Sequence, residues 1–347
     1  ELELQFFLTD YFSHLQKYDF LMYFCFMILV TGAAGFIGSC LVSRLNQLGF
    51  NDLLLVDDFS YESKKNNLIQ KKFIKKVDRL DFINNINFFF SDIHLVYHLG
   101  ARTDTIDTNE DVFLKLNLNY SKKIWQKCVE NQIPILYASS AACYGNGKLG
   151  FDDCHKLVYR LKPLNAYARS KNNFDKWVLD QSLYPPFWAG VRFFNVYGPN
   201  EYHKGRMASV ILHAFNNINK KGKIELFKSY LKEYNNGAQS RDFIYVKDLI
   251  QVIILMMMKK NKSGIYNLGT GKSRTFNDLA RAIFKSMGKV EKIFYIDMPS
   301  EIKETYQYYT EANMQKFVNN EYKFNFTNLE EGVSDYINNY LLYSKYY

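Results

Sequence analysis

The sequence predicts an α/β fold: a doubly wound parallel sheet with a smaller C-terminal domain. Three observations predict it. Short apolar runs alternate with stretches of helical periodicity, a glycine-rich turn follows the first of these runs, and the strict alternation loosens after about residue 196. Alternating strands and helices are typical of a parallel sheet with helices on both of its faces.

The first strand, turn and helix open this alternation. Met27–Val30 is a short apolar run, and the glycine-rich segment 31–38 follows it at once. Helical periodicity then continues through Leu41, Leu45 and Leu48, so we expect strand, turn and helix in that order. Further strands are expected at 52–56, 95–99, 133–138, 191–196, 241–246 and 264–268, with a loop over 229–240 and a helix over 275–287 that opens near Thr275.

The same pattern divides the chain into two domains. Residues 27–195, with returning pieces near 240–270, are expected to form the larger sheet domain. Residues 196–239 and 271–347 are expected to form the smaller one. A ligand site is expected in the cleft between the two domains, at the carboxyl ends of the strands.

Residues 1–26 precede the first predicted strand and begin without Met. The apolar run from Phe20 to Val30 is too short to span a bilayer. A basic start and a small-residue cleavage site, which a signal peptide needs, are both missing. We therefore interpret Met27 as the natural start and residues 1–26 as an upstream extension, disordered or artefactual; a membrane anchor is the alternative.

Charge and cysteine content limit the class of protein. The chain has 347 residues and a formal net charge of +9, which suits anionic ligands such as nucleotides. Nucleic-acid binding would need basic residues clustered on one element, whereas the densest runs, at 71–76 and 220–221, are short and are expected on exposed helix faces. Five cysteines without a CxxC pair argue against a disulfide framework or a zinc site. We expect a cytoplasmic protein that binds no metal and no nucleic acid.

The glycine-rich segment has the spacing G-x-x-G-x-x-G, with Gly32, Gly35 and Gly38. Such a turn lets the backbone approach a pyrophosphate at the positive end of a helix. The alternative is a tight packing turn without a ligand. Because the turn directly follows a buried strand and opens a helix, a Rossmann-type dinucleotide site is favoured.

An acid stands about twenty residues beyond this turn. Asp57 ends the second predicted strand, where a carboxylate can bind the adenosine ribose and often indicates NAD. Lys64 and Arg79 follow and could neutralise a 2′-phosphate, although either could equally be a surface charge. The residues therefore leave NAD and NADP both open.

A second group of residues is suited to acid–base chemistry. Tyr167 and Lys171 form a Y-x-x-x-K pair, which on a helix lies one turn apart on one face. A phenol is a poor base at neutral pH because its ordinary pKa is about 10, and a nearby ammonium favours the phenolate. Upstream, Ser140 follows an apolar strand and can hydrogen-bond the reacting oxygen, whereas Ser139 is expected to be structural.

Ser140, Tyr167 and Lys171, in this order after the glycine turn, resemble the catalytic triad of short-chain dehydrogenases. Four further motifs resemble the extended group of that superfamily, which acts on nucleotide sugars. These motifs are PLNAY at 163–167, RFFNVYGP at 192–199, RDFIYVKD at 241–248 and NLGTG at 267–271. The resemblance covers nearly all of residues 27–340 and implies a nucleotide-sugar enzyme.

A narrower resemblance rests on EYHKGRMASV at 201–210 and on Tyr306-Gln307-x-x-Thr310. Both are similar to the ADP-glyceromanno-heptose 6-epimerase family. The resemblance implies oxidation of C6 of ADP-D-glycero-β-D-manno-heptose with bound NADP to a 6-keto intermediate, and return of the hydride to the other face. Tyr167 and Lys204 would share proton transfer, and Lys171 would lower the pKa of the phenol and bind the nicotinamide ribose. Without the resemblance, Lys204 would be interpreted as a surface lysine.

The resemblance also implies residues of both binding sites, a homo-oligomer and a product used in lipopolysaccharide core assembly. Cofactor positions fall on Phe36, Ile37, Asp57, Asp58, Lys64, Arg79, Asn117, Lys171 and Val196. Substrate positions fall on Asn195, Arg206, His213, Phe227, Arg241 and Tyr306. His213 sits on an apolar helix, where a structural histidine is a competing interpretation. Cys143, Arg206 and the long loop 229–240 depart from the family pattern.

Rival functions of two classes remain open: another enzyme of the extended group, and a non-catalytic protein. A UDP- or GDP-sugar 4-epimerase needs only the triad, and the His-Lys-Gly segment argues against it. A dehydratase is disfavoured because Ala141-Ala142-Cys143 stands where such enzymes place an acid pair. A non-catalytic dinucleotide sensor would be expected to lose Tyr167 or Lys171, and both are present.

Overall fold

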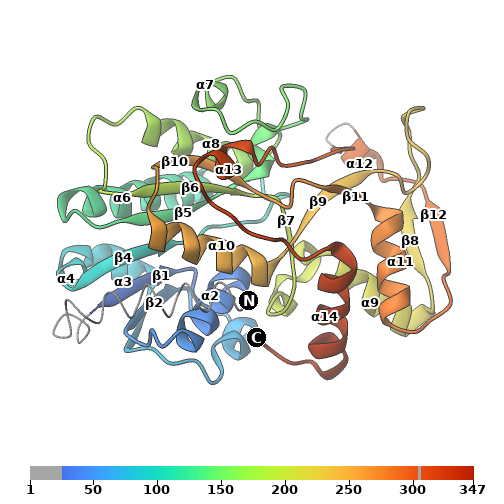
Figure 1. Ribbon diagram of the computed structural model, residues 1–347, viewed down its shortest axis with the longest axis horizontal. Helices are drawn as coiled ribbons and strands as arrows, with labels where there is room; N and C mark the ends of the chain where they lie inside the picture. The colour runs from blue at the N-terminus through green and yellow to red at the C-terminus, as the bar shows by residue number, and fades with distance from the viewer. Residues whose placement is uncertain (1–25, 304–305) are drawn as a thin grey trace.

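The computed structural model describes residues 26–303 and 306–347, and a seven-stranded parallel sheet forms its larger part (Figure 1). The strand order is β10-β6-β5-β4-β1-β2-β3, so the chain winds outward in both directions from β1 and β4. The strands are β1 (Met27–Thr31), β2 (Leu53–Asp57), β3 (Lys75–Asp78), β4 (Ile93–His98), β5 (Ile135–Ser140), β6 (Trp188–Phe193) and β10 (Gly264–Leu268).

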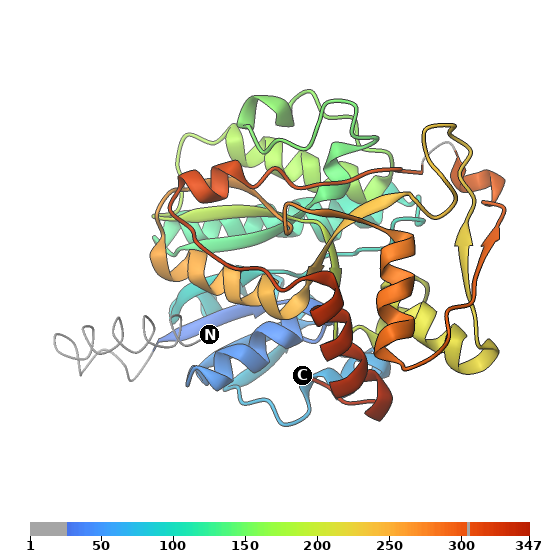
Figure 2. The same cartoon turned by 45° about the vertical axis from the view of Figure 1, so that its right-hand side comes forward.

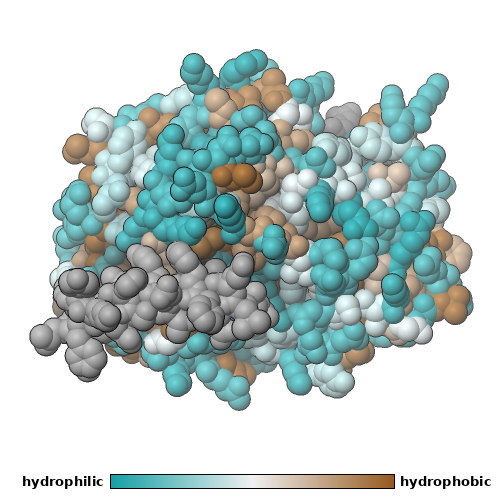
Figure 3. Space-filling view, in the orientation of Figure 1, coloured by the Kyte–Doolittle hydropathy of each residue, from teal (hydrophilic) through white to brown (hydrophobic). Residues whose placement is uncertain are grey.

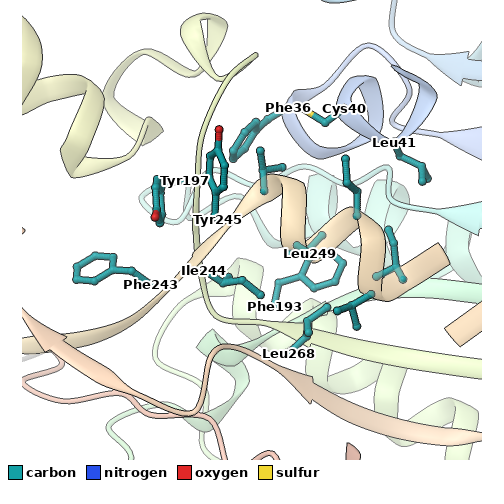
Figure 4. Packing of buried hydrophobic residues seen from close by; sticks show 14 of the residues in the cluster. Phe36, Cys40, Leu41, Phe193, Tyr197, Phe243, Ile244, Tyr245, Leu249 and Leu268 are labelled. Atoms are coloured by element: carbon teal, nitrogen blue, oxygen red, sulfur yellow. The ribbon is translucent and has the colours of Figure 1, made fainter. Parts of the chain in front are cut away.

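Helices cover both faces of this sheet, as predicted. On one face α2 (Phe36–Gln47) packs against α10 (Val246–Lys259), which Figure 2 shows in front of the sheet. The other face carries α6 (Tyr120–Glu130) and α8 (Ala166–Leu179). Figure 4 shows part of the apolar core between the first pair of helices and the strands. Two buried layers therefore hold the sheet rigid and fix the carboxyl ends of its strands.

A smaller group of elements lies beside the carboxyl ends of the strands. Its three-stranded sheet has the order β11-β9-β7, and β8 pairs with β12 in a separate parallel ladder. The strands are β7 (Asn195–Tyr197), β8 (Ile224–Phe227), β9 (Ser240–Tyr245), β11 (Ser273–Thr275) and β12 (Ile293–Ile296). The helices are α9 (Val210–Lys221), α11 (Phe276–Ser286), α12 (Ser300–Lys303) and α14 (Leu329–Asn339).

Short helical segments complete the described part of the chain. The α-helical ones are α3 (Arg79–Asn84), α4 (Ile86–Phe90), α5 (Glu110–Phe113), α7 (His155–Val158) and α13 (Gln315–Asn319). The 3-10 segments are η2 (Glu62–Leu68), η4 (Ala141–Tyr144), η5 (Tyr202–Met207) and η6 (Leu341–Tyr343), and η3 (Leu114–Asn119) is a π-helical turn that joins α5 to α6.

The expected strands and the helix near 275 are present, with shifted bounds. Thr275 caps α11 in a capping box with Asp278, which explains why the helix begins there. The expected strand 191–196 is divided, because β6 ends at Phe193 and Asn195 begins a strand of the other sheet. Residues 228–239 hold no helix or strand, as expected of the loop. The division into two domains stays a prediction.

One expectation about the lysine runs is wrong. Lys75 and Lys76 lie on β3 at the edge of the sheet, and 71–72 lie in the loop before it. Charged side chains are common on edge strands because they discourage pairing with another chain. Lys220 and Lys221 do lie at the end of a helix, α9.

The surface and the helices of the described residues can be compared with what a membrane-spanning protein would need. On the face seen in Figure 3, hydrophilic side chains cover most of the coloured surface and apolar ones are scattered. No helix within residues 26–303 and 306–347 is both long enough and apolar enough to cross a bilayer. Residues 1–25 lie outside the described part of the chain, and so does their interpretation as an extension.

Candidate active site

A cleft of about 850 Å³ opens at the carboxyl ends of the strands of the large sheet and extends toward β7 and η5. A cleft at this edge is where open parallel sheets bind their ligands. It brings together most of the residues that the sequence singled out. Those that line it are Gly32, Gly35, Phe36, Ile37, Gly38, Asp57, Lys64, Arg79, Ser140, Tyr167, Lys171, Asn195, Val196 and Lys204.

The glycine-rich turn has no room for side chains. A Cβ at Gly32, whose φ is +69°, would lie 2.7 Å from the Cα of Gly100, and one at Gly38 would lie 2.1 Å from the carbonyl oxygen of Gly32. Gly35 occupies the N-cap of α2, where no side chain satisfies the free N–H groups of the first turn. These N–H groups and the bare backbone fit a pyrophosphate.

The acids after β2 are already engaged. Asp57 accepts hydrogen bonds from the N–H of Ala34 at 2.8 Å and from Lys64 Nζ at 2.9 Å. Asp58 does not line the cleft, but it pairs at 2.8 Å with Arg79, which does. Desolvation acts to raise the pKa of Asp58, but hydrogen bonds from Ser60 and the charges of Arg79 and Lys64 together outweigh it and hold that pKa below its usual value. The adenosine end of the cleft therefore presents Lys64 and Arg79 beside two carboxylates.

The triad is assembled by α8 and the end of β5. The side chain of Asn165 caps α8 by accepting the N–H of Ala168 at 2.8 Å, and this starts the helix just before Tyr167. Ser140 acts on the phenol of Tyr167 in the sense that lowers its pKa. Lys171 is buried and donates to the carbonyl oxygen of Ala138 at 2.8 Å.

Burial shifts the pKa values of Tyr167 and Lys171 in opposite directions. Burial raises the pKa of Tyr167 to about 12, and Ser140 only partly opposes this. Burial also lowers the pKa of Lys171 to about 8, against the charge of Asp175. Desolvation therefore dominates the pKa of this phenol, and the assistance of Lys171 stays a prediction.

A buried ion pair supports the triad from behind. Asp175, one turn beyond Lys171 on α8, pairs with Arg192 of β6 at 2.9 Å, and both side chains are fully buried. Ser139 donates to the same carboxylate at 2.9 Å. The interpretation of Ser139 as a structural residue is confirmed, since its hydroxyl holds β5 to α8.

Lys204 reaches the cleft from the other side. It lies on η5, and its ammonium stands 5.4 Å from the ring centre of Phe36 at the start of α2. Burial lowers its pKa, partly offset by the carboxylate of Glu201. Glu201 is fully buried and accepts from the backbone N–H and the hydroxyl of Ser209, each at 2.6 Å, so both ends of this loop are tied together.

Three predicted substrate residues form a cluster near the cleft. The guanidinium of Arg241 lies 5.2 Å from the ring centre of Tyr306, and that ring meets Phe227 edge to face. Arg241 is buried and has no carboxylate partner among the described side chains. Burial lowers its pKa, which reflects a cation that lacks a counter-ion. Its ring neighbour Phe276, at 5.6 Å, lines the cleft.

Seven predicted residues lie outside the cleft lining, namely Asp58, Asn117, Arg206, His213, Phe227, Arg241 and Tyr306. Arg206 is exposed and pairs with Asp104 at 2.9 Å. His213 lies on an exposed face of α9. Asn117 is buried and holds both the N–H and the carbonyl oxygen of Arg102, at 2.8 and 2.9 Å.

The sequence analysis missed the segment that follows β4. Leu99 to Asp107 contributes much of the cleft lining, and Arg102 pairs with Asp107 at 3.1 Å. The available signal was positional: this segment leaves the carboxyl end of a central strand, where parallel sheets place ligand-binding loops.

Comparison with known proteins assigns the chain to a family. Residues 28–269 match the NAD dependent epimerase/dehydratase family. The chain belongs to this family. Among curated members, an ADP-L-glycero-D-manno-heptose-6-epimerase of Fusobacterium nucleatum is 41% identical over 329 residues, covering 91% of this chain and 98% of that protein. The enzyme of the same name from Nitratidesulfovibrio vulgaris is 42% identical over 317 residues, with the same coverage of both chains.

Solved structures of two epimerases have the same fold. The ADP-L-glycero-D-manno-heptose-6-epimerase of Helicobacter pylori superposes with a TM-score of 0.76 at 27% identity, covering 90% of this chain and 95% of that one. A UDP-N-acetylglucosamine 4-epimerase of Methanobrevibacter ruminantium also gives 0.76, at 23% identity, with 92% and 98% covered. The second likeness is one of fold alone.

Proposed function

We propose that this chain epimerises C6 of ADP-D-glycero-β-D-manno-heptose with a bound dinucleotide. The relatives of this chain carry the name of that reaction. The observation that carries the proposal is that Tyr167 of α8 and Lys204 of η5 line one cleft. Inverting a centre by oxidation and reduction needs proton transfer in two substrate poses, and two groups on separate elements supply it.

The residues at one end of the cleft fit a dinucleotide. Gly32 and Gly38 leave bare backbone at the N-terminus of α2, and this suits a pyrophosphate. Lys64 and Arg79 at the adenosine end favour NADP, because their charges can meet a 2′-phosphate. When bound, the nicotinamide would take hydride from C6 and return it to the opposite face.

Ser140 and Tyr167 are placed to hold the oxygen on C6. At neutral pH the phenol of Tyr167 is protonated, because burial raises its pKa to about 12. It is therefore ready to donate a proton to a ketone oxygen, and the charge of Lys171 must assist the reverse step. The pKa of Lys204 is lowered by burial, which brings its neutral amine closer to physiological pH and suits it to accept or donate a proton.

Arg241 is the proposed anchor of the diphosphate. Its buried guanidinium has no counter-ion among the described residues and is held between the rings of Tyr306 and Phe276. A planar guanidinium in this setting binds phosphate oxygens in a fixed geometry. Phe227 would pack beside the nucleotide, and Asn195 would contact the sugar. A homo-oligomeric state and a cytoplasmic location stay predictions.

The test is an epimerisation assay on the purified protein. ADP-D-glycero-β-D-manno-heptose is supplied without added dinucleotide, and the configuration at C6 is followed by NMR. We expect conversion to a mixture of both epimers, with cofactor carried on the protein. Tyr167→Phe and Lys204→Met should each lose turnover, while Tyr159→Phe and Lys228→Met, at exposed positions, should not.

The same assay can overturn the proposal. No conversion, even with NADP and NAD supplied, would contradict the heptose assignment and direct the search to UDP- and GDP-sugars. Full activity of Lys204→Met would contradict the sharing of proton transfer between two groups. Inactivity of Tyr159→Phe or Lys228→Met would show that loss of turnover does not report on the cleft.

A further inference from the structure

We propose that Asn67 is a positioning residue that ties the loop of Lys204 to the glycine-rich turn. The inference rests on the proposed function, since it concerns a residue assigned there to proton transfer. Asn67 lies on η2 and is fully buried. It does not line the cleft, so it can influence the site only through the residues it holds.

The amide nitrogen of Asn67 faces acceptors from two segments. It lies 2.9 Å from the carbonyl oxygen of Ala34, between the glycines of the turn. It also lies 3.1 Å from the carbonyl oxygen of Asn200 and 3.2 Å from Nδ1 of His203. His203 immediately precedes Lys204, so one side chain joins the dinucleotide turn to the loop that carries the lysine.

The partners fix which way the amide points. The reversed amide would set its carbonyl oxygen against the carbonyl oxygens of Ala34 and Asn200, two acceptors that cannot donate. Burial also lowers the pKa of His203 to about 4, so its ring is neutral at pH 7 and Nδ1 can accept. In this orientation Oδ1 of Asn67 has no hydrogen-bond partner among the described residues. An unpaired buried oxygen costs free energy, so this orientation of the amide depends on the hydrogen bonds that its nitrogen donates.

Both attached segments have little freedom at these points. The N–H of Ala34 is held by Asp57 at 2.8 Å, so with Asn67 both of its backbone polar groups are bonded. Asn200 has φ +73°, a left-handed conformation that asparagine tolerates better than most other non-glycine residues. Its side chain donates to Ser39 of α2 at 2.9 Å. The donors of Asn67 are therefore part of what fixes the backbone leading into Lys204.

The experiment measures backbone hydrogen exchange and needs no substrate. Asn67→Asp keeps the shape of the side chain and removes its donors, and Asn66→Asp makes the same change at the exposed neighbour. In Asn67→Asp with NADP bound, we expect the backbone amides of 200–207 to exchange at least about tenfold faster than in wild type. The amides of β1 and β4 should exchange at the wild-type rate. Asn66→Asp should behave as wild type. Asn67→Ser, which introduces no buried charge, should show the same local effect if Asn67→Asp does not fold.

Kinetics give a second readout. We expect kcat of Asn67→Asp to fall at least about tenfold while KM for the nucleotide sugar changes less than about threefold, because the loop and not the diphosphate anchor is released. Unchanged exchange of 200–207, or equal acceleration throughout the protein, would overturn the proposal. Failure of both Asn67 variants to fold would also overturn it and leave a purely structural role. Inactive wild-type enzyme would count against the proposed function, while the exchange result would still decide the role of Asn67.

Discussion

The backbone N–H of Ala34 donates a 2.8 Å hydrogen bond to the carboxylate of Asp57, so the acid at the end of β2 holds the glycine-rich turn. The same carboxylate accepts from Lys64 at 2.9 Å and from the N–H of Asp58 at 2.7 Å. A carboxylate has about four acceptor positions, and three are used here. Asp57 therefore has little capacity left for ribose hydroxyls, and this shifts the expected cofactor contacts to the neighbouring cations.

Arg79 should decide the preference for NADP. Arg79→Ala removes the charge that can meet a 2′-phosphate, and a charge-assisted hydrogen bond is worth about 1.5–3 kcal/mol. We expect the Kd for NADP to rise about 10- to 100-fold and that for NAD to change less than about threefold, measured by isothermal titration. Arg281→Ala, at an exposed arginine far along the chain, is the matched control. Equal weakening of both cofactors would contradict the assignment.

Arg241 should control binding of the nucleotide sugar. Arg241→Lys keeps the charge but loses the planar fork held by Tyr306 and Phe276. We expect KM to rise about 10- to 100-fold with kcat changed much less, in steady-state epimerisation. Arg274 lies directly opposite in the β9–β11 pair and is paired with Glu330, so Arg274→Lys is the control that should leave KM near wild type. A change confined to kcat would show that Arg241 does not anchor the ground state.

Asp175 should be essential for stability. Asp175→Asn leaves the buried guanidinium of Arg192 uncompensated, and breaking a buried pair in this way costs about 3–5 kcal/mol. We expect that loss in the free energy of unfolding, measured with urea. Asp180→Asn, at the exposed end of the same helix, should change it by less than about 0.5 kcal/mol. A loss below about 1 kcal/mol for Asp175→Asn would mean that Arg192 finds another partner.

His98 should make stability depend on pH below neutrality. Burial lowers its pKa to about 3 from an ordinary 6.5, and both ring nitrogens are hydrogen-bonded, to Thr31 and Ser121. Between these pH values the unfolded chain binds more protons, so stability falls as pH falls from 6.5 toward 3. From pH 7 to pH 5 this histidine should cost about 2 kcal/mol.

The variant His98→Asn isolates that contribution. Between pH 7 and pH 5, the free energy of unfolding of this variant, measured with urea, should fall by about 2 kcal/mol less than that of wild type. His213→Asn, which changes an exposed histidine, serves as the control for the substitution itself. An identical pH dependence in wild type and His98→Asn would show that the imidazole of His98 does not titrate as its burial requires.

Local patterns in the sequence were sufficient for the fold class and for the core of the site. The glycine turn, the Y-x-x-x-K pair and the cap at Thr275 each depend on residues a few positions apart, and backbone geometry converts such spacing directly into position. The edge strand β3 was not predicted, because its sequence, KKVD, lacks the apolar run that marks a buried strand.

Contacts between distant segments were decided by the tertiary structure alone. Spacing along the chain did not indicate that Asp57 holds the glycine turn, that Arg241 lies against Tyr306, or that Asn67 joins that turn to the Lys204 loop. Such pairs depend on how helices and loops pack over the sheet, and burial then sets their pKa values and hydrogen-bond partners. The sequence by itself therefore determined the chemistry available to this protein, and packing decided which groups meet and in which state of protonation.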